Sequence, residues 1–203
     1  MFFIAGPKVT DVVKRYTDLT GKSAMANIMC HITEEAIEET TPNNRPFIVC
    51  RAGHAGIQQY AQTWAGDNRT SWDTLKYNIA TMLGMSLCGV SNYGCDIGGF
   101  FGNAPEPELL VRWVQNGIFH PRFSIHSVNA DITVTEPWMY PKYTDKIRDA
   151  IHLRYQLMPY FYSLMYQAHR NGISILQPLC SMYQQDNTYY DEAENLWWGT
   201  LYL

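Results

Sequence analysis

WAGDNRTSW, at residues 64–72, is the stretch that says most about the fold and chemistry of this chain. It sets one carboxylate, Asp67, among tryptophans, a glycine and an amide. A carboxyl group walled by indole rings is poorly solvated when ionised, so we expect the pKa of Asp67 to rise. A carboxyl group protonated near neutral pH can act as a general acid toward a leaving oxygen. An alternative is a Gly-Asp-Asn turn that caps a helix starting near Ser71, with the tryptophans in the core.

Three further segments accompany this stretch. RPFIVCRAG has the pattern of a short buried strand that ends in Arg51, and GCDIGGF places a second carboxylate, Asp96, before two glycines. The third segment is RWVQNGIFHPRFSIH, which ends in His126 and is followed by EPW. In this order, the four segments resemble glycoside hydrolase family 31, the retaining α-glucosidases and α-xylosidases. The resemblance covers about residues 27–179, with a shorter match at residues 2–25.

The resemblance implies an α/β fold: a partial (β/α)8 TIM barrel, roughly its second half, which lacks the first strands. Residues 1–25 would be a remnant of the segment before the barrel, residues 26–180 its C-terminal half, and residues 181–203 the start of a β-sandwich region. Hydrophobic periodicity and helix-end signals agree with alternating elements. Helices are expected at residues 9–19, 33–40, 71–85, 107–116 and 145–170, with a kink at Pro159 and an end at Asn171-Gly172. Parallel strands are expected at residues 47–50, 87–90, 119–123 and 173–179.

Catalytic groups of a (β/α)8 barrel project from the C-terminal ends of the strands and from the loops that follow. By resemblance, Asp67 is the general acid/base, and the terminal sugar is bound by Arg51, Trp64, Asp96, Phe100 and His126. The resemblance makes Trp64 and Phe100 apolar walls and the other three polar contacts to the sugar. Other interpretations stay open, because Arg51 and Asp96 could form only a buried ion pair and His126 could be a loop histidine with satisfied hydrogen bonds.

One departure from the family concerns the second carboxylate. Retaining glycosidases use two carboxyl groups about 5–5.5 Å apart, one as nucleophile and one as acid/base. The family's nucleophile lies in a segment like Trp-x-Asp-x-Asn-Glu, and no such segment occurs between Met1 and Arg51. Residue 27 onward resembles sequence well past the nucleophile, so the resemblance implies truncation inside the chain and at its C-terminus. Gln177 also stands where the family usually has arginine.

Two functions follow as hypotheses. The first is retaining hydrolysis of terminal α-glucosidic bonds in oligosaccharides or glucosides, with α-xylosides as the alternative substrate. The second is a catalytically silent truncated relative, or a gene fragment, that keeps part of a sugar pocket. A half barrel would expose sheet edges and apolar faces, so self-association is also expected.

Length and composition agree with part of an intracellular enzyme, although Tyr and Trp are also good core fillers. The 203 residues carry a formal net charge of −4, which favours no nucleic-acid partner, and 14% of them are aromatic, which suits stacking on sugar rings. Five cysteines, an odd number without CxxC spacing, are typical of reduced thiols in a cytoplasmic protein, and we expect neither a metal nor a cofactor. No run approaches the roughly 18–20 apolar residues that span a bilayer, so no membrane partner is expected.

Overall fold

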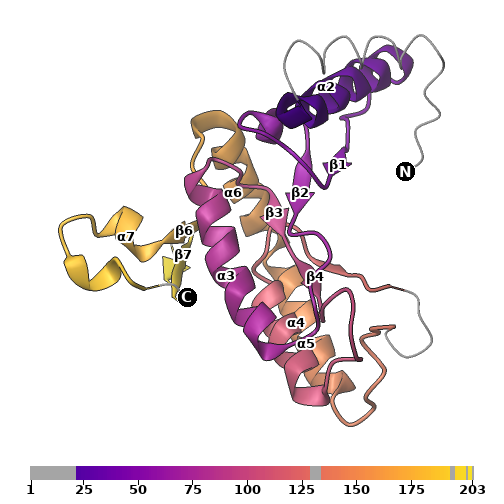
Figure 1. Ribbon diagram of the computed structural model, residues 1–203, viewed down its shortest axis with the longest axis vertical. Helices are drawn as coiled ribbons and strands as arrows, with labels where there is room; N and C mark the ends of the chain where they lie inside the picture. The colour runs from indigo at the N-terminus through magenta and orange to yellow at the C-terminus, as the bar shows by residue number, and fades with distance from the viewer. Residues whose placement is uncertain (1–21, 129–133, 193–194, 200, 203) are drawn as a thin grey trace. The chain divides into compact units, whose positions relative to one another are not determined.

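The computed structural model describes residues 22–128, 134–192, 195–199 and 201–202 (Figure 1). The chain divides into two compact units, Met1–Thr63 and Trp64–Leu203, and each is described by itself. The helix expected at residues 9–19 lies outside the described residues. Among the described residues, no helix combines the length and the apolar character needed to cross a membrane.

The first unit contains one long helix and the start of a parallel sheet. Its elements are α2 (Lys22–Thr40), β1 (Val49–Cys50), η1 (Ile57–Gln59) and the first residues of β2 (Gln62–Trp64). The strands β1 and β2 pair in parallel, with Val49 opposite Gln62. The strand expected at residues 47–50 is therefore confirmed, whereas the helix begins well before residue 33. Thr33 caps nothing, because it lies inside α2 and its hydroxyl donates to the carbonyl of Met29 at 2.7 Å.

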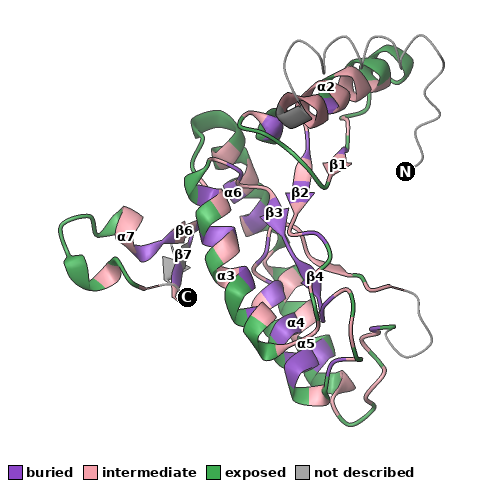
Figure 2. Ribbon diagram, in the orientation of Figure 1, coloured by how far each residue is buried: buried purple, intermediate pink, exposed green. Residues whose placement is uncertain are grey.

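The second unit continues the alternation of strands and helices. Its elements up to residue 171 are α3 (Trp72–Leu87), β3 (Tyr93–Gly94), β4 (Asp96–Ile97), α4 (Pro107–Gly117), β5 (Ser124–Ile125), α5 (Thr144–Gln156) and α6 (Met158–Asn171). The strands β4 and β5 are parallel and are joined through α4, which is the βαβ arrangement of an α/β fold. Both β3 and β4 are buried throughout (Figure 2).

The predicted helix ends are largely confirmed. The Ser71 side chain accepts a hydrogen bond from the backbone N–H of Thr74 at 3.1 Å and so caps α3. Pro107 stands in the first turn of α4, where no N–H is needed. The helix expected at residues 145–170 is broken at Leu157 into α5 and α6, because Pro159 cannot donate the hydrogen bond that would continue it. Gly172, with φ of 69°, ends α6 as expected.

The strand predictions were less accurate. The strands expected at residues 87–90 and 119–123 are wrong, because Leu87 is the last residue of α3 and residues 119–122 form a turn before β5. A short apolar run has no period that separates a strand from the end of a helix. The strands β2 and β4 were not predicted. The strand expected at residues 173–179 is present as β6 (Leu176–Pro178), but its partner β7 (Leu196–Trp198) is antiparallel.

The core of the second unit lies around α4. Its buried members come from α3, β4, α4 with the residue that follows it, and α5: Leu75, Ile97, Leu109, Leu110, Val111, Trp113, Val114, Ile118 and Ile147. Because α4 buries most of its apolar side chains here, it fixes the positions of the two parallel strands that it connects. Burial of each such side chain contributes about 1.5–3 kcal/mol before the entropic cost of folding.

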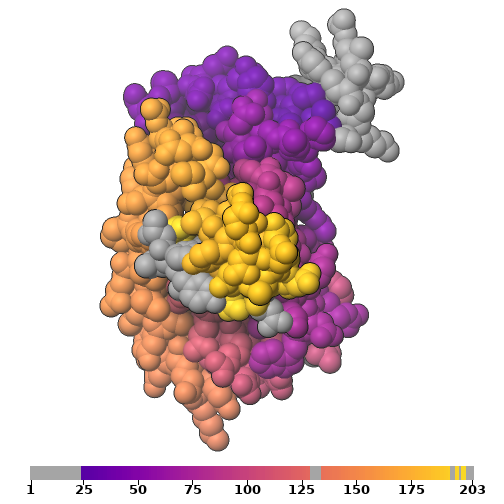
Figure 3. Space-filling model, turned by 90° about the vertical axis from the view of Figure 1, so that its left-hand side faces the viewer, coloured from indigo at the N-terminus to yellow at the C-terminus, as the bar shows by residue number. Residues whose placement is uncertain are grey.

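The C-terminal residues form an antiparallel sheet of β6, β7 and β8 (Leu201–Tyr202), with α7 (Leu179–Met182) and η2 (Asn187–Tyr189) between β6 and β7. Figure 3 shows this segment in yellow beside α6. Its anchor is Trp198, whose ring lies edge-on to those of Tyr160 at 4.9 Å and Phe161 at 4.8 Å in α6. The ring of Phe119 contacts the same indole at 5.3 Å. The C-terminal sheet therefore packs on α6 and on the turn after α4.

Candidate functional site

The predicted site residues of the second unit lie on adjacent loops. Asp67 follows β2, Asp96 begins β4, and His126 directly follows β5. The backbone N–H of Phe100 donates to the carbonyl of Asn68 at 2.7 Å, and the N–H of Val128 donates to the carbonyl of Phe100 at 2.8 Å. The loop after β4 therefore lies between the Asp67 loop and the segment after β5. Side chains at the carboxyl ends of parallel strands meet at one edge of a sheet, which is where a TIM barrel places its chemistry.

Two glycines allow these loops to approach each other. Gly98 and Gly99 have φ values of 91° and 85°, a region that side-chain-bearing residues rarely adopt. A Cβ atom on Gly99 would lie 2.6 Å from the Cα of Thr70, and one on Gly98 would lie 2.6 Å from the Cγ2 of Thr135. The Thr70 hydroxyl donates to the carbonyl of Gly98 at 3.0 Å. The double glycine thus seats the Asp67 loop directly against the Asp96 loop.

Asp96 is fully buried and forms an ion pair with Arg122. An Arg122 guanidinium N–H donates to Asp96 Oδ1 at 3.2 Å, and the arginine side chain is 12% exposed. Arg122 comes close because its backbone N–H donates to the carbonyl of Tyr93 at 3.3 Å. Gly94 makes room, since a Cβ atom there would collide with the carbonyl oxygen of Arg122. The arginine paired with Asp96 is therefore Arg122, whereas an ion pair of Asp96 with Arg51 was one of the interpretations that the sequence left open.

The electrostatics of Asp96 reflect its neighbours. Burial raises the pKa of the Asp96 carboxyl group, and the positive charge of Arg122 offsets part of that rise. His126 lowers the pKa further, whereas the negative charge of Asp67 raises it, so both groups lie within electrostatic reach. The second carboxyl oxygen, Oδ2, is buried and has no hydrogen-bond partner among the described residues. A buried acceptor without a partner is costly, and a ligand hydroxyl group could donate to it.

The aromatic residues lie differently from the predicted wall around Asp67. Asp67 is exposed. Trp72 donates from Nε1 to Glu106 Oε1 at 2.6 Å. Trp64 is half-buried, with the Arg122 guanidinium 5.2 Å from the centre of its ring, a cation–π contact. The expectation that indole rings enclose Asp67 is therefore wrong for the described residues.

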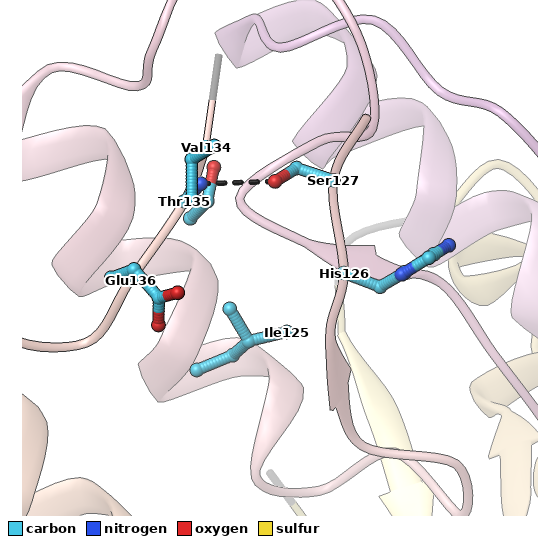
Figure 4. Close-up of a pocket in the computed structure, with 6 residues that line it drawn as sticks. All are labelled: Ile125, His126, Ser127, Val134, Thr135 and Glu136. Carbon is cyan, nitrogen blue, oxygen red and sulfur yellow. Dashed lines mark hydrogen bonds between the residues drawn. The ribbon is translucent and has the colours of Figure 1, made fainter. Parts of the chain in front are cut away.

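His126 and Phe100 form a second pair. The rings lie 5.2 Å apart at a tilt of 41°, and His126 is exposed. Figure 4 shows that the side chains of Ile125 and Ser127 point to one side of their strand while His126 points to the other. This alternation is the rule for extended backbone. His126 therefore faces the loop that carries Phe100.

A cavity of about 390 Å³ lies on the opposite side of this strand, lined by Ile125, His126, Ser127, Val134, Thr135 and Glu136 (Figure 4). The backbone N–H of Thr135 donates to the Ser127 hydroxyl at 2.9 Å across it. The Thr135 hydroxyl is buried and has no hydrogen-bond partner among the described residues. The cavity therefore borders the segment that carries His126.

The second unit thus brings together five of the six predicted residues: Trp64, Asp67, Asp96, Phe100 and His126. Arg51 belongs to the first unit, where it directly follows β1 and is exposed. The sequence interpretation missed Arg122, although it lies in the HPRF run just before His126. Within the described ranges, no cluster of three or more His, Cys, Asp or Glu residues is arranged to hold a metal ion.

Comparisons with known proteins bear on the fold of the chain. Residues 7–164 match the family model described as the glycosyl hydrolases family 31 TIM-barrel domain. Human neutral alpha-glucosidase AB is 48% identical over 148 residues, which are 72% of this chain and 16% of the human protein. A probable glucan 1,3-alpha-glucosidase of Oryza sativa subsp. japonica is 44% identical over 152 residues, 74% of this chain and 16% of that protein.

Among solved structures, the family 31 alpha-glucosidase from Bacteroides thetaiotaomicron superposes with a TM-score of 0.82 at 35% identity. The superposition covers 87% of this chain and 30% of that chain. The matches confirm the expected fold class, part of a TIM-barrel domain of α/β type. The chain spans 16% of the length of each of the two curated relatives.

Proposed function

The chain belongs to glycosyl hydrolase family 31, and on this basis we propose that it acts in the retaining hydrolysis of terminal α-glucosidic bonds, with Asp67 as the general acid/base. One observation supports the proposal above the others: the loops of Asp67, Asp96 and His126 are hydrogen-bonded to one another around the Gly98-Gly99 turn. The printed names of the two curated relatives, an alpha-glucosidase and a probable glucan 1,3-alpha-glucosidase, support glucosides as the substrate class.

Asp67 suits the acid/base role because it is exposed and can exchange protons with solvent. In the first step of a retaining reaction it donates its proton to the glycosidic oxygen as the C1–O bond breaks. In the second step it takes a proton from the attacking water. Both steps need a carboxyl group beside the sugar rather than one buried beneath it, which excludes Asp96 from this role.

Asp96 suits sugar binding instead. Its Oδ1 accepts from Arg122, so its buried Oδ2 is free to accept a hydrogen bond from a sugar hydroxyl. His126 lies beside it and offers a ring nitrogen to a second hydroxyl, and the Phe100 ring supplies an apolar surface. Arg51 and Trp64 complete the proposed set, with Trp64 supporting Arg122 through its ring.

Judged by the family pattern, this chain lacks the nucleophile, because no Trp-x-Asp-x-Asn-Glu segment precedes Arg51. We therefore propose that the isolated chain contributes the acid/base and sugar contacts but forms no glycosyl-enzyme intermediate. An external anion can replace a missing carboxylate nucleophile. Azide would attack C1 as the aryl oxygen leaves with the proton of Asp67, giving phenol and β-glucosyl azide.

The test is formation of glucosyl azide from phenyl α-glucoside, whose poor leaving group needs protonation. We expect the chain with sodium azide to release phenol and β-glucosyl azide, and Asp67→Asn to abolish that release. Asp73→Asn is the matched control, because Asp73 is an exposed aspartate in the first turn of α3. Equal rates with Asp67→Asn and the intact chain would refute the acid/base role. Phenyl α-xyloside, run in parallel, tests the alternative substrate.

We also propose a cytoplasmic location, on the chemistry of the cysteines. All five are free thiols, and burial raises the pKa of Cys30 and of Cys95 to about 12, so both stay protonated. Free thiols are typical of reducing compartments. Fractionation of the source cells tests this, and recovery of the chain from the lumen of an organelle would contradict it.

A further inference from the structure

We propose that Arg154, on α5, is a positioning residue that holds the turn at residues 118–121 and thereby aims Arg122 at Asp96. Arg154 was not among the predicted site residues, and it lies 28 residues or more along the chain from each of them. The proposal rests on the proposed function insofar as Asp96 binds the sugar. The placement of Arg122 can be tested without any sugar.

Arg154 bonds the turn at three points. One terminal nitrogen donates to the carbonyls of Ile118 at 2.6 Å and His120 at 2.8 Å, and the other donates to the carbonyl of Pro121 at 3.2 Å. These carbonyls follow the last turn of α4, where backbone acceptors lack partners within the helix and carry partial negative charge. A planar guanidinium can bridge such a fan of acceptors, which a single ammonium group cannot do.

Aromatic rings fix the guanidinium from both sides of the turn. It lies 4.5 Å from the centre of the Phe161 ring in α6 and 5.1 Å from that of Phe123 just before β5. Burial lowers the pKa of Arg154 to about 10, so the group still carries its charge at neutral pH. The arginine is thus held by α6 while it holds the turn.

His120 gives the turn another fixed point. It is fully buried, and burial together with the charge of Arg154 lowers its pKa to about 3. The ring is therefore neutral, and Nε2 lies 2.8 Å from Asn116 Oδ1, which assigns the ring proton to Nε2 as donor. The neutral ring avoids a second positive charge beside Arg154, so the turn tolerates the arginine at close range.

The route from this turn to the site is short. Pro121 accepts from Arg154, and the next residue, Arg122, pairs with Asp96 through its side chain and with Tyr93 through its backbone N–H. Release of the turn would let residues 118–121 shift and carry Arg122 with them. A displacement of about 1 Å is enough to weaken a charge-assisted hydrogen bond of this kind.

The experiment measures the pKa of Asp96 by carbon NMR of the carboxyl group in three variants. Arg154→Met keeps the length of the side chain but removes all three donations, and Arg154→Lys keeps the charge and the stem. Arg148→Met is the matched control, because Arg148 lies on the same helix, is 55% exposed and pairs with Asp145. The charged groups that act on Asp96 are Arg122, His126 and Asp67, and none of these changes.

We expect the pKa of Asp96 to rise by about one unit or more in Arg154→Met, by less in Arg154→Lys, and not at all in Arg148→Met. Thermal unfolding of each variant separates this result from a loss of stability. A lower melting temperature with an unchanged Asp96 pKa in Arg154→Met would overturn the proposal and leave Arg154 a purely structural residue. Because the readout needs no substrate, a failed azide assay would refute the proposed function and leave this inference standing.

Discussion

Gly99 provides the sharpest test of how the site is assembled, through substitution by alanine. Its φ of 85° costs a side-chain-bearing residue about 1–2 kcal/mol. An added Cβ would also lie 2.6 Å from the Cα and 2.8 Å from the backbone nitrogen of Thr70, which cannot move aside as a flexible side chain could. Forcing an extra carbon into a packed region costs about 1–3 kcal/mol. We therefore expect Gly99→Ala to lower the free energy of unfolding by about 2–5 kcal/mol.

Substitutions at two other glycines separate the cost of positive φ from the cost of steric overlap. Gly172 has φ of 69° but no atom within 4 Å of an added Cβ, so Gly172→Ala isolates the backbone strain and should cost about 1–2 kcal/mol. Gly84 lies inside α3 with neither positive φ nor a nearby atom. Gly84→Ala should therefore raise the free energy of unfolding by up to about 1 kcal/mol, because alanine favours the helix.

Urea unfolding followed by circular dichroism measures all three changes, provided that the slope of the unfolding free energy against urea concentration is the same in each variant. The expected order of stability is Gly84→Ala, then the natural sequence, then Gly172→Ala, then Gly99→Ala. If Gly99→Ala costs no more than Gly172→Ala, the close approach of the Asp67 loop to the double glycine is refuted.

Three further predictions follow from the site and the surface. Without an added nucleophile, the isolated chain should not hydrolyse phenyl α-glucoside above the buffer rate, and turnover that Asp67→Asn abolishes would show that another carboxylate serves as nucleophile. The pKa of His120 is about 3 in the folded chain, against a usual 6.5. Its stabilising contribution is therefore complete above pH 6.5 and is lost as the pH falls toward 3. In His120→Gln, the free energy of unfolding should depend less on pH over this range. Met158, Tyr162 and Tyr166, exposed at spacings of four on α6, should drive self-association. Light scattering across a concentration series should show a rising mass that Tyr162→Glu suppresses, and a constant mass would contradict it.

Helices could be predicted from the sequence because their signals are local. Ser71 caps α3 with its own hydroxyl, and Pro107 opens α4, so each helix start depends on residues within one turn. Among the strands that the structure describes, only β1 and β6 lie within ranges predicted from the sequence. β3, β4 and β5 are two residues long, and a strand this short is defined by its partner rather than by any period of its own.

The candidate site likewise has features that could be predicted from the sequence and features that could not. Asp67 and Asp96 were singled out by the resemblance of their segments to the family, and the nearby glycines Gly66, Gly98 and Gly99 have positive φ. The exposure of Asp67 could not be predicted, because the hydrogen-bond partner of the neighbouring Trp72 is distant in sequence. Trp72 donates to Glu106, which follows the Asp96 loop in the sequence and lies 34 positions from Trp72.

The arginine that pairs with Asp96 shows why the remainder needs the folded chain. The sequence contains Arg51 at a strand end and Arg122 in a turn, and either could neutralise a buried carboxylate. The choice depends on register: Asp96 stands opposite Ser124 in the parallel pair of β4 and β5, so Arg122 lies two residues earlier along the neighbouring segment. Arg122 lies in the turn just before β5, and its guanidinium donates to Asp96 Oδ1 at 3.2 Å. Arg154 of α5 then fixes that segment through three backbone carbonyl oxygens. Every residue has a backbone carbonyl, so the sequence does not indicate which of them the arginine bonds. A carboxylate can therefore be found by its motif, but the groups that set its charge and position follow only from strand pairing and from the helix that packs behind the turn.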